Sequence, residues 1–97
     1  LRVFLTDGGV WLNPEPMAIL TDPSAYEGQP YALGWIVPPN APWAGGKVLA
    51  HEGSNTMWHA VAAAGPAKGV AFIALANVSV EAGAANGLMP GLVRAAG

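Results

Sequence analysis

The sequence contains no cysteine and very few charged side chains. The absence of cysteine excludes disulfide bonds and thiolate metal sites, but it does not identify a compartment. Charged residues make up 10% of the 97 residues, against about 25% in a usual soluble domain. Because so little charge cannot coat a free-standing domain, we expect much of the surface to face more protein. Residues 1–97 are therefore predicted to be a single incomplete domain that packs against the remainder of its own polypeptide or a homo-oligomer partner.

Basic residues and long apolar runs are also scarce. A net charge of −2 provides neither a basic surface for nucleic acid nor a polybasic patch for a membrane. The longest apolar run, around GVAFIALA, is far shorter than the roughly 20 residues that cross a bilayer. We therefore expect no nucleic-acid partner and no membrane insertion.

Turn-forming residues separate the N-terminal half into short elements. Residues 1–12 are apolar but are interrupted by Asp7-Gly8-Gly9, which is typical of a helix end followed by a turn. The segment NPEPMAILTDP predicts a helix over 14–20, with Asn13 as its N-cap. The segment YALGWIV is rich in aromatic and β-branched residues and predicts a strand over 31–37.

The C-terminal half is expected to contain three antiparallel strands and a helix. The strands are predicted near 47–52, 57–64 and 69–77, and the helix near 81–95. The alanines within 57–64 favour a helix by local propensity, and this alternative stays open. However, the compact turn over 65–69 contains glycine and proline and favours a hairpin. The fold class is therefore α+β, an antiparallel sheet flanked by helices.

Four motifs then resemble a known superfamily. They are Tyr31 to Trp35 (YALGW), His51-Glu52-Gly53, the P-x-x-G turn Pro66 to Gly69, and Asn77 at the end of the following strand. In this order they are similar to the C-terminal part of the serine β-lactamase-like hydrolases, which include class C-type β-lactamases, D-alanyl-D-alanine carboxypeptidases and esterases. The resemblance implies the C-terminal portion of a β-lactamase/transpeptidase-like fold, no cofactor and no metal, and a periplasmic or extracytoplasmic location.

The resemblance also implies roles for several residues. His51 would be a hydrogen-bonding and electrostatic element at the site, and the backbone N–H of Ser54 would be an oxyanion-hole donor. Side chains alternate along a strand, so His51 and Gly53 should face the substrate while Glu52 faces away. A bare Gly53 would let substrate lie close to the strand, where Asn55 and Trp58 are the other predicted substrate-binding residues.

The nucleophile of that superfamily is missing from the chain. The superfamily attacks with the serine of an S-x-x-K motif, assisted by a tyrosine from a second motif. None of Ser24, Ser54 and Ser79 has a lysine three residues later, and neither tyrosine is followed by asparagine two residues later. We therefore expect the parent protein to hydrolyse an ester, peptide or lactam through an acyl-enzyme, and the chain alone to be inactive. Glu52 stands where true β-lactamases commonly have threonine, which favours an esterase or peptidase.

Other interpretations of the same residues remain. His59 is interpreted as a polar tip of the hairpin, without a role in the site. A zinc site on His51, Glu52 and His59 would need the H-E-x-x-H pattern, but Asn55 stands at the position of its second histidine. A non-catalytic relative that binds a cell-wall or small-molecule ligand, and an independent small α+β binding module, are the alternative functions.

Overall fold

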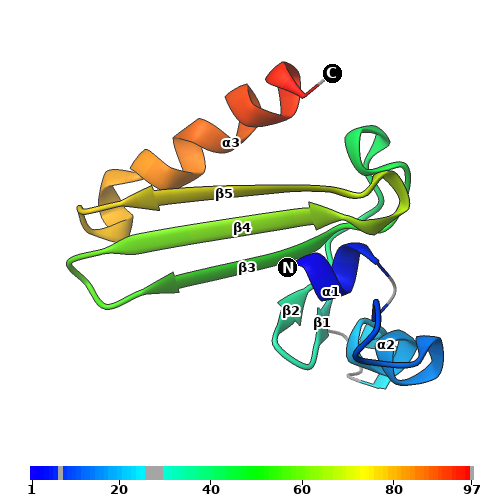
Figure 1. The fold of residues 1–97 in the computed structure, drawn as a ribbon. Coiled ribbons are helices and arrows are strands. Elements are labelled where there is room, and N and C mark those ends of the chain that lie inside the picture. The colour runs from blue at the N-terminus through cyan, green and yellow to red at the C-terminus, as the bar shows by residue number, and fades with distance from the viewer. Residues whose placement is uncertain (7, 26–29, 97) are drawn as a thin grey trace.

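In the computed structural model, which describes residues 1–6, 8–25 and 30–96, five strands form one antiparallel sheet (Figure 1). Strands β3 (Leu49–Ser54), β4 (His59–Gly65) and β5 (Val70–Ala76) are joined by short turns and are neighbours in the sheet. The predicted hairpin is therefore confirmed, with boundaries shifted by one or two residues. Between β4 and β5, a 3-10 turn over Pro66–Lys68 ends at Gly69, whose φ of 64° is left-handed. The predicted turn contains glycine at the position where only glycine takes that conformation easily.

The prediction of one strand over 31–37 is wrong. The structure has two short strands there, β1 (Tyr31–Ala32) and β2 (Trp35–Ile36), which pair antiparallel with each other. Gly34 lies between them with a φ of 92°, and this left-handed conformation reverses the chain. The aromatic and β-branched composition indicates strand correctly, but the prediction places Gly34 inside a single strand, whereas it forms the turn between two.

In the described part of the chain, three α-helices accompany the sheet: α1 (Arg2–Leu5), α2 (Pro14–Leu20) and α3 (Ala84–Ala95). The helix predicted over 14–20 is confirmed, although Asn13 makes no side-chain hydrogen bond at its N-cap position. The C-terminal helix begins later than predicted, because a 3-10 turn over 80–82 and a left-handed Gly83 precede it. Asp7, predicted in the turn after the first helix, lies outside the described residues.

The two faces of the sheet are covered differently (Figure 1). Val61 of β4 and Ala74 of β5 are directly paired and are buried with Ala85 of α3. We call this side the α3 face. The opposite side bears Ile73 and Leu75, whose exposed fractions are 57% and 72%. We call it the open face.

Gly65, the last residue of β4, is expected to tolerate no larger side chain. A Cβ at this position would lie 2.7 Å from Cα and 2.8 Å from Cβ of Ala44, which is itself buried. Because backbone atoms cannot rotate away, Gly65→Ala should lower the free energy of unfolding by about 1–3 kcal/mol. Urea denaturation of the intact protein measures this. Gly53→Ala is the matched control in the neighbouring strand, since a Cβ there meets no atom within 4 Å; equal losses for both would contradict the prediction.

Candidate functional site

The motif His51-Glu52-Gly53 lies in the middle of β3, and its side chains alternate between the two faces of the sheet. His51 is paired with Ala62 and, through it, with Ile73 of the open face. Glu52 is paired with Val61 and therefore points to the α3 face. The predicted opposition of His51 and Glu52 is confirmed.

His51 is held in one orientation by the turn between β1 and β2. Its Nδ1 lies 2.8 Å from the carbonyl oxygen of Gly34. Because a carbonyl only accepts, Nδ1 donates this hydrogen bond, and Nε2 takes no part in it. Trp35 adds an edge contact to the ring, with the centroids 6.2 Å apart. Nε2 is thus the ring atom that remains able to accept or exchange a proton.

Gly34 and Trp35 are site residues that the sequence interpretation missed. The sequence includes them in the YALGW motif but gives no sign of a contact with His51. The signal that could have identified them is the glycine within that motif. A glycine inside an otherwise good strand pattern indicates a bend, and the bend here brings a carbonyl to His51.

The edge of β3 that faces away from β4 is only partly covered. Strand β2 pairs with β3 at a single position, Ile36 with Ala50. From His51 to Ser54, no strand within the described residues pairs with this edge, which we call the free edge of β3. An unpaired strand edge offers backbone N–H and C=O groups to an extended ligand. Gly53, without a side chain, lies within it.

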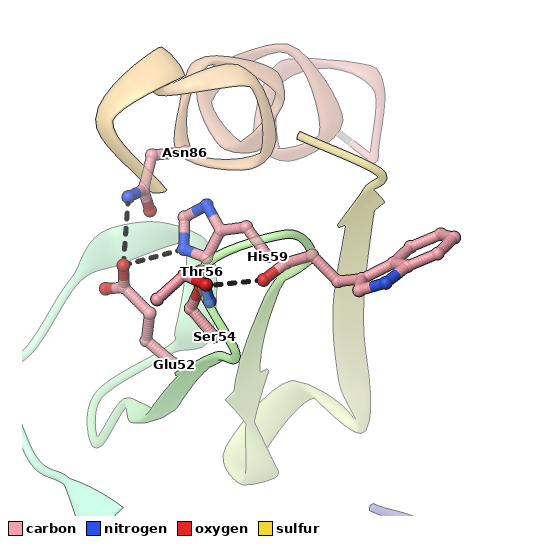
Figure 2. A network of polar contacts seen from close by, with 6 residues as sticks. Glu52, Ser54, Thr56, His59 and Asn86 are labelled. Atoms are coloured by element: carbon pink, nitrogen blue, oxygen red, sulfur yellow. Dashed lines mark hydrogen bonds and ion pairs between the residues drawn. The ribbon is translucent and has the colours of Figure 1, made fainter. Parts of the chain in front are cut away.

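The turn between β3 and β4 is organised by the predicted site residues Ser54 and Asn55. The Ser54 hydroxyl donates to the carbonyl of Trp58 at 2.7 Å and accepts from the N–H of Thr56 at 3.1 Å (Figure 2). Asn55 Oδ1 accepts from the N–H groups of Met57 and Trp58 at 3.2 and 2.9 Å. These bonds hold Thr56 at a φ of 74°, which is unfavourable for a β-branched residue. The hydroxyl of Ser54 is therefore engaged in the turn, and the role of its backbone N–H stays a prediction.

A hollow of about 580 Å³ lies beside this turn. Gly53, Ala60 and Leu75 form one directly paired row across three strands of the open face, and all three line the hollow together with Trp58. No Lys, Arg, Asp or Glu is among the lining residues. The structure thus brings four of the five predicted site residues together, whereas His51 occupies the next row of the same face, outside the lining.

A polar cluster occupies the α3 face directly behind the motif (Figure 2). Glu52 Oε1 lies 2.7 Å from Nε2 of His59, and Nδ2 of Asn86 in α3 donates to the same oxygen at 3.4 Å. The interpretation of His59 as a polar tip of the hairpin is wrong: it is buried, with an exposed fraction of 2%. Its direct partner Ser54 begins the turn, but the histidine side chain points under α3 and away from the tip.

The buried histidine is satisfied at only one of its two nitrogens. Within the described residues, His59 Nδ1 is buried without a hydrogen-bond partner. Leaving such a buried polar atom unsatisfied costs about 1–3 kcal/mol, while a hydrogen bond to a charged group contributes about 1.5–3 kcal/mol. Because the two effects are similar in size, the intact pair adds little net stability, but removal of Glu52 alone would lose the favourable bond and leave Nε2 unpaired as well. Stability alone therefore does not explain why Glu52 and His59 are paired.

The structure does not bring His51, Glu52 and His59 together as metal ligands. His51 lies on the face opposite Glu52 and His59. In residues 1–6, 8–25 and 30–96, no group of three or more His, Cys, Asp or Glu side chains could hold a metal ion. Across the same ranges, no helix combines the length and apolar character needed to cross a bilayer.

Among the residues that the structure describes, Asp22 and Glu81 have a lowered carboxyl pKa, and both are distant in sequence from β3. The backbone N–H of Ser24 donates to Asp22 and lowers the pKa of that carboxyl. The hydroxyl of Ser79 lowers the pKa of Glu81 in the same way. Hydrogen bonds to a charged carboxylate favour the ionised form, which explains both shifts without reference to the candidate site.

Comparisons of the chain with protein-family models, with curated proteins and with solved structures found no match. The α+β class and the five-stranded antiparallel sheet are established by the structure. The resemblance to serine β-lactamase-like hydrolases stays a prediction that rests on the four sequence motifs.

Proposed function

We propose that this chain is the C-terminal part of a serine hydrolase domain with a β-lactamase/transpeptidase-like fold. In this proposal it supplies one wall of an active site, and the remainder of the polypeptide supplies the serine nucleophile and its lysine and tyrosine partners. The observation that carries the proposal is the free edge of β3, where an oriented His51 precedes a side-chain-free Gly53. An acyl group lying along this edge would meet backbone N–H donors and the free Nε2 of His51.

The proposed substrate is an uncharged ester with an apolar acyl group. The hollow next to Gly53 is lined by Trp58, Ala60 and Leu75 and by no charged aspartate, glutamate, lysine or arginine. A carboxylate-bearing lactam or peptide would need a cation or an uncommitted hydroxyl there, and the hydroxyl of Ser54 already donates to the Trp58 carbonyl. Glu52, in the place of the threonine of true β-lactamases, points to the α3 face and cannot contact such a substrate. These features favour an esterase among the hydrolases of the superfamily.

One observation favours a second candidate, the non-catalytic relative that binds a small molecule. Ser54 is among the residues that line the hollow, but its hydroxyl donates to the Trp58 carbonyl at 2.7 Å, and within the described residues no base contacts it. The hollow within this chain can therefore bind a ligand but cannot attack it. Only a nucleophile from outside residues 1–97 separates the two candidates.

Residues 1–97 alone are expected to hydrolyse neither p-nitrophenyl esters nor a chromogenic β-lactam above background. An oxyanion donor accelerates nothing without an activated nucleophile beside it. The intact protein is expected to hydrolyse p-nitrophenyl esters and to form an acyl-enzyme, seen by mass spectrometry as the added acyl mass on one serine. The comparison uses initial rates at matched concentrations, with substrate alone as the blank.

The two functions give different results in the intact protein. Ligand binding without turnover or acylation would contradict the esterase and support the non-catalytic relative. Acylation of Ser54 itself would contradict the assignment of the nucleophile to another part of the polypeptide.

A further inference from the structure

We propose that Glu52 is a positioning residue for the candidate active-site strand, which it ties to β4 and α3 from the face opposite the substrate. The inference concerns the geometry of β3. Its consequence for catalysis rests on the proposed function, but its effect on the strand does not.

The part of β3 that carries the site is supported on one side only. From His51 to Ser54 the strand pairs with β4, while β2 reaches no farther than Ala50. A strand paired on a single side frays and twists more readily than a central strand. Because the donors of an active site must be held closely in place, this half of β3 requires a further attachment.

Glu52 provides that attachment through two different elements. Its direct partner across the ladder is Val61, so the bond to His59 is a diagonal one that resists sliding of β3 along β4. Asn86, in the first turn of α3, donates to the same carboxylate oxygen. One oxygen atom therefore joins β3, β4 and α3 (Figure 2).

Only His59 of this cluster is buried, and this makes the attachment directional. The His59 side chain has an exposed fraction of 0%, whereas Glu52 has 40%. The histidine is therefore fixed by its surroundings, and the more exposed Glu52 takes its position from it. A carboxylate only accepts, so Nε2 of His59 donates to it, while the buried Nδ1 has no partner within the described residues. Glutamine can replace the carboxylate in this role, because its amide oxygen accepts the same two bonds.

The test is hydrogen exchange of the backbone amides in the intact protein, followed by mass spectrometry or NMR. Glu52→Ala should accelerate exchange of the protected amides in 51–54 by about 10- to 100-fold, with those of 70–76 within about threefold of the unmodified protein. Glu52→Gln should restore exchange in 51–54 to within about threefold. Glu15→Ala, which removes an exposed carboxylate from α2, is the control for loss of charge.

Asn86→Ala keeps the inference testable if Glu52→Ala does not fold. Asn86 is exposed in α3, and alanine favours a helix, so this variant retains the fold. It should accelerate exchange in 51–54 by about two- to fivefold. Unchanged exchange in 51–54 in Asn86→Ala, and in Glu52→Ala where it folds, would overturn the inference. So would equal acceleration of exchange throughout the sheet, which a general loss of stability produces.

Kinetics of the same variants separate this inference from the proposed function. In an active intact protein, Glu52→Ala should lower kcat about tenfold and leave KM within about twofold, because a misplaced oxyanion donor acts on the transition state. One outcome is that Glu52→Ala accelerates amide exchange in 51–54 selectively while His51→Ala is fully active. This would support the attachment by Glu52 and overturn the proposed esterase site. Unchanged exchange in Glu52→Ala together with an inactive His51→Ala would overturn the attachment by Glu52 and support the proposed esterase site.

Discussion

His51→Ala in the intact protein is expected to lower kcat/KM for p-nitrophenyl esters by about 10- to 1,000-fold, the range for loss of a positioned proton-transfer or electrostatic partner. The ring is oriented by the Gly34 carbonyl, 2.8 Å from Nδ1, so Nε2 is the atom available to a leaving group or a base. The fold should survive, because His51 is exposed and lies outside the buried cluster under α3. Steady-state kinetics with an unfolding midpoint for each variant measure both effects.

A second substitution identifies which nitrogen of His51 acts. In His51→Asn, the amide N–H can still donate to the Gly34 carbonyl, but nothing remains at the position of Nε2. If Nε2 is the functional atom, His51→Asn should be within about threefold of His51→Ala. An active His51→Ala beside an inactive Glu52→Gln would instead place the site on the α3 face of the sheet.

The strands and helices that local patterns could predict are those bounded by proline, glycine or other turn-forming residues. The helix over 14–20 begins at Pro14 and ends before Asp22-Pro23, and the structure has the same bounds. The hairpin of β4 and β5 followed from the Pro66 to Gly69 turn against the helix propensity of its alanines. Packing explains why those alanines form a strand: Ala63 and Ala64 are buried, and the adjoining Gly65 approaches Ala44 closely. Such close approach requires small side chains, whatever their local propensity.

The candidate site was predictable along β3 but not across the sheet. Alternation on a strand is a local property, so the opposite directions of His51 and Glu52 followed from the sequence. The contact of His51 with Gly34 joins residues 17 apart, and that of Glu52 with Asn86 joins residues 34 apart. Such contacts depend on the turn at Gly34 and on the placement of α3, which no local pattern encodes. The burial of His59 was missed for the same reason.

The free edge of β3 and the cluster behind it have different tolerances for substitution. On the α3 face, three polar side chains meet at one oxygen and removal of any one changes the others. On the open face, Gly53 has empty space where a side chain would be. A substitution at Gly53 can therefore probe the approach of substrate without disturbing the attachment of the strand.

Gly53→Val in the intact protein is expected to lower kcat/KM by about 100-fold or more while the fold is retained. A Cβ at Gly53 would meet no atom within 4 Å, and valine suits a strand, so the free energy of unfolding should not fall. The two methyl groups would project from the open face of β3 beside the hollow and displace an acyl group by more than an ångström, which is enough for a loss of this size. Gly53→Ala should give an intermediate loss, and the acetyl ester should be less affected than longer acyl esters. A stable Gly53→Val variant with kcat/KM within about threefold of the unmodified protein would show that substrate does not approach this edge, and with that the proposed site on β3 would be wrong.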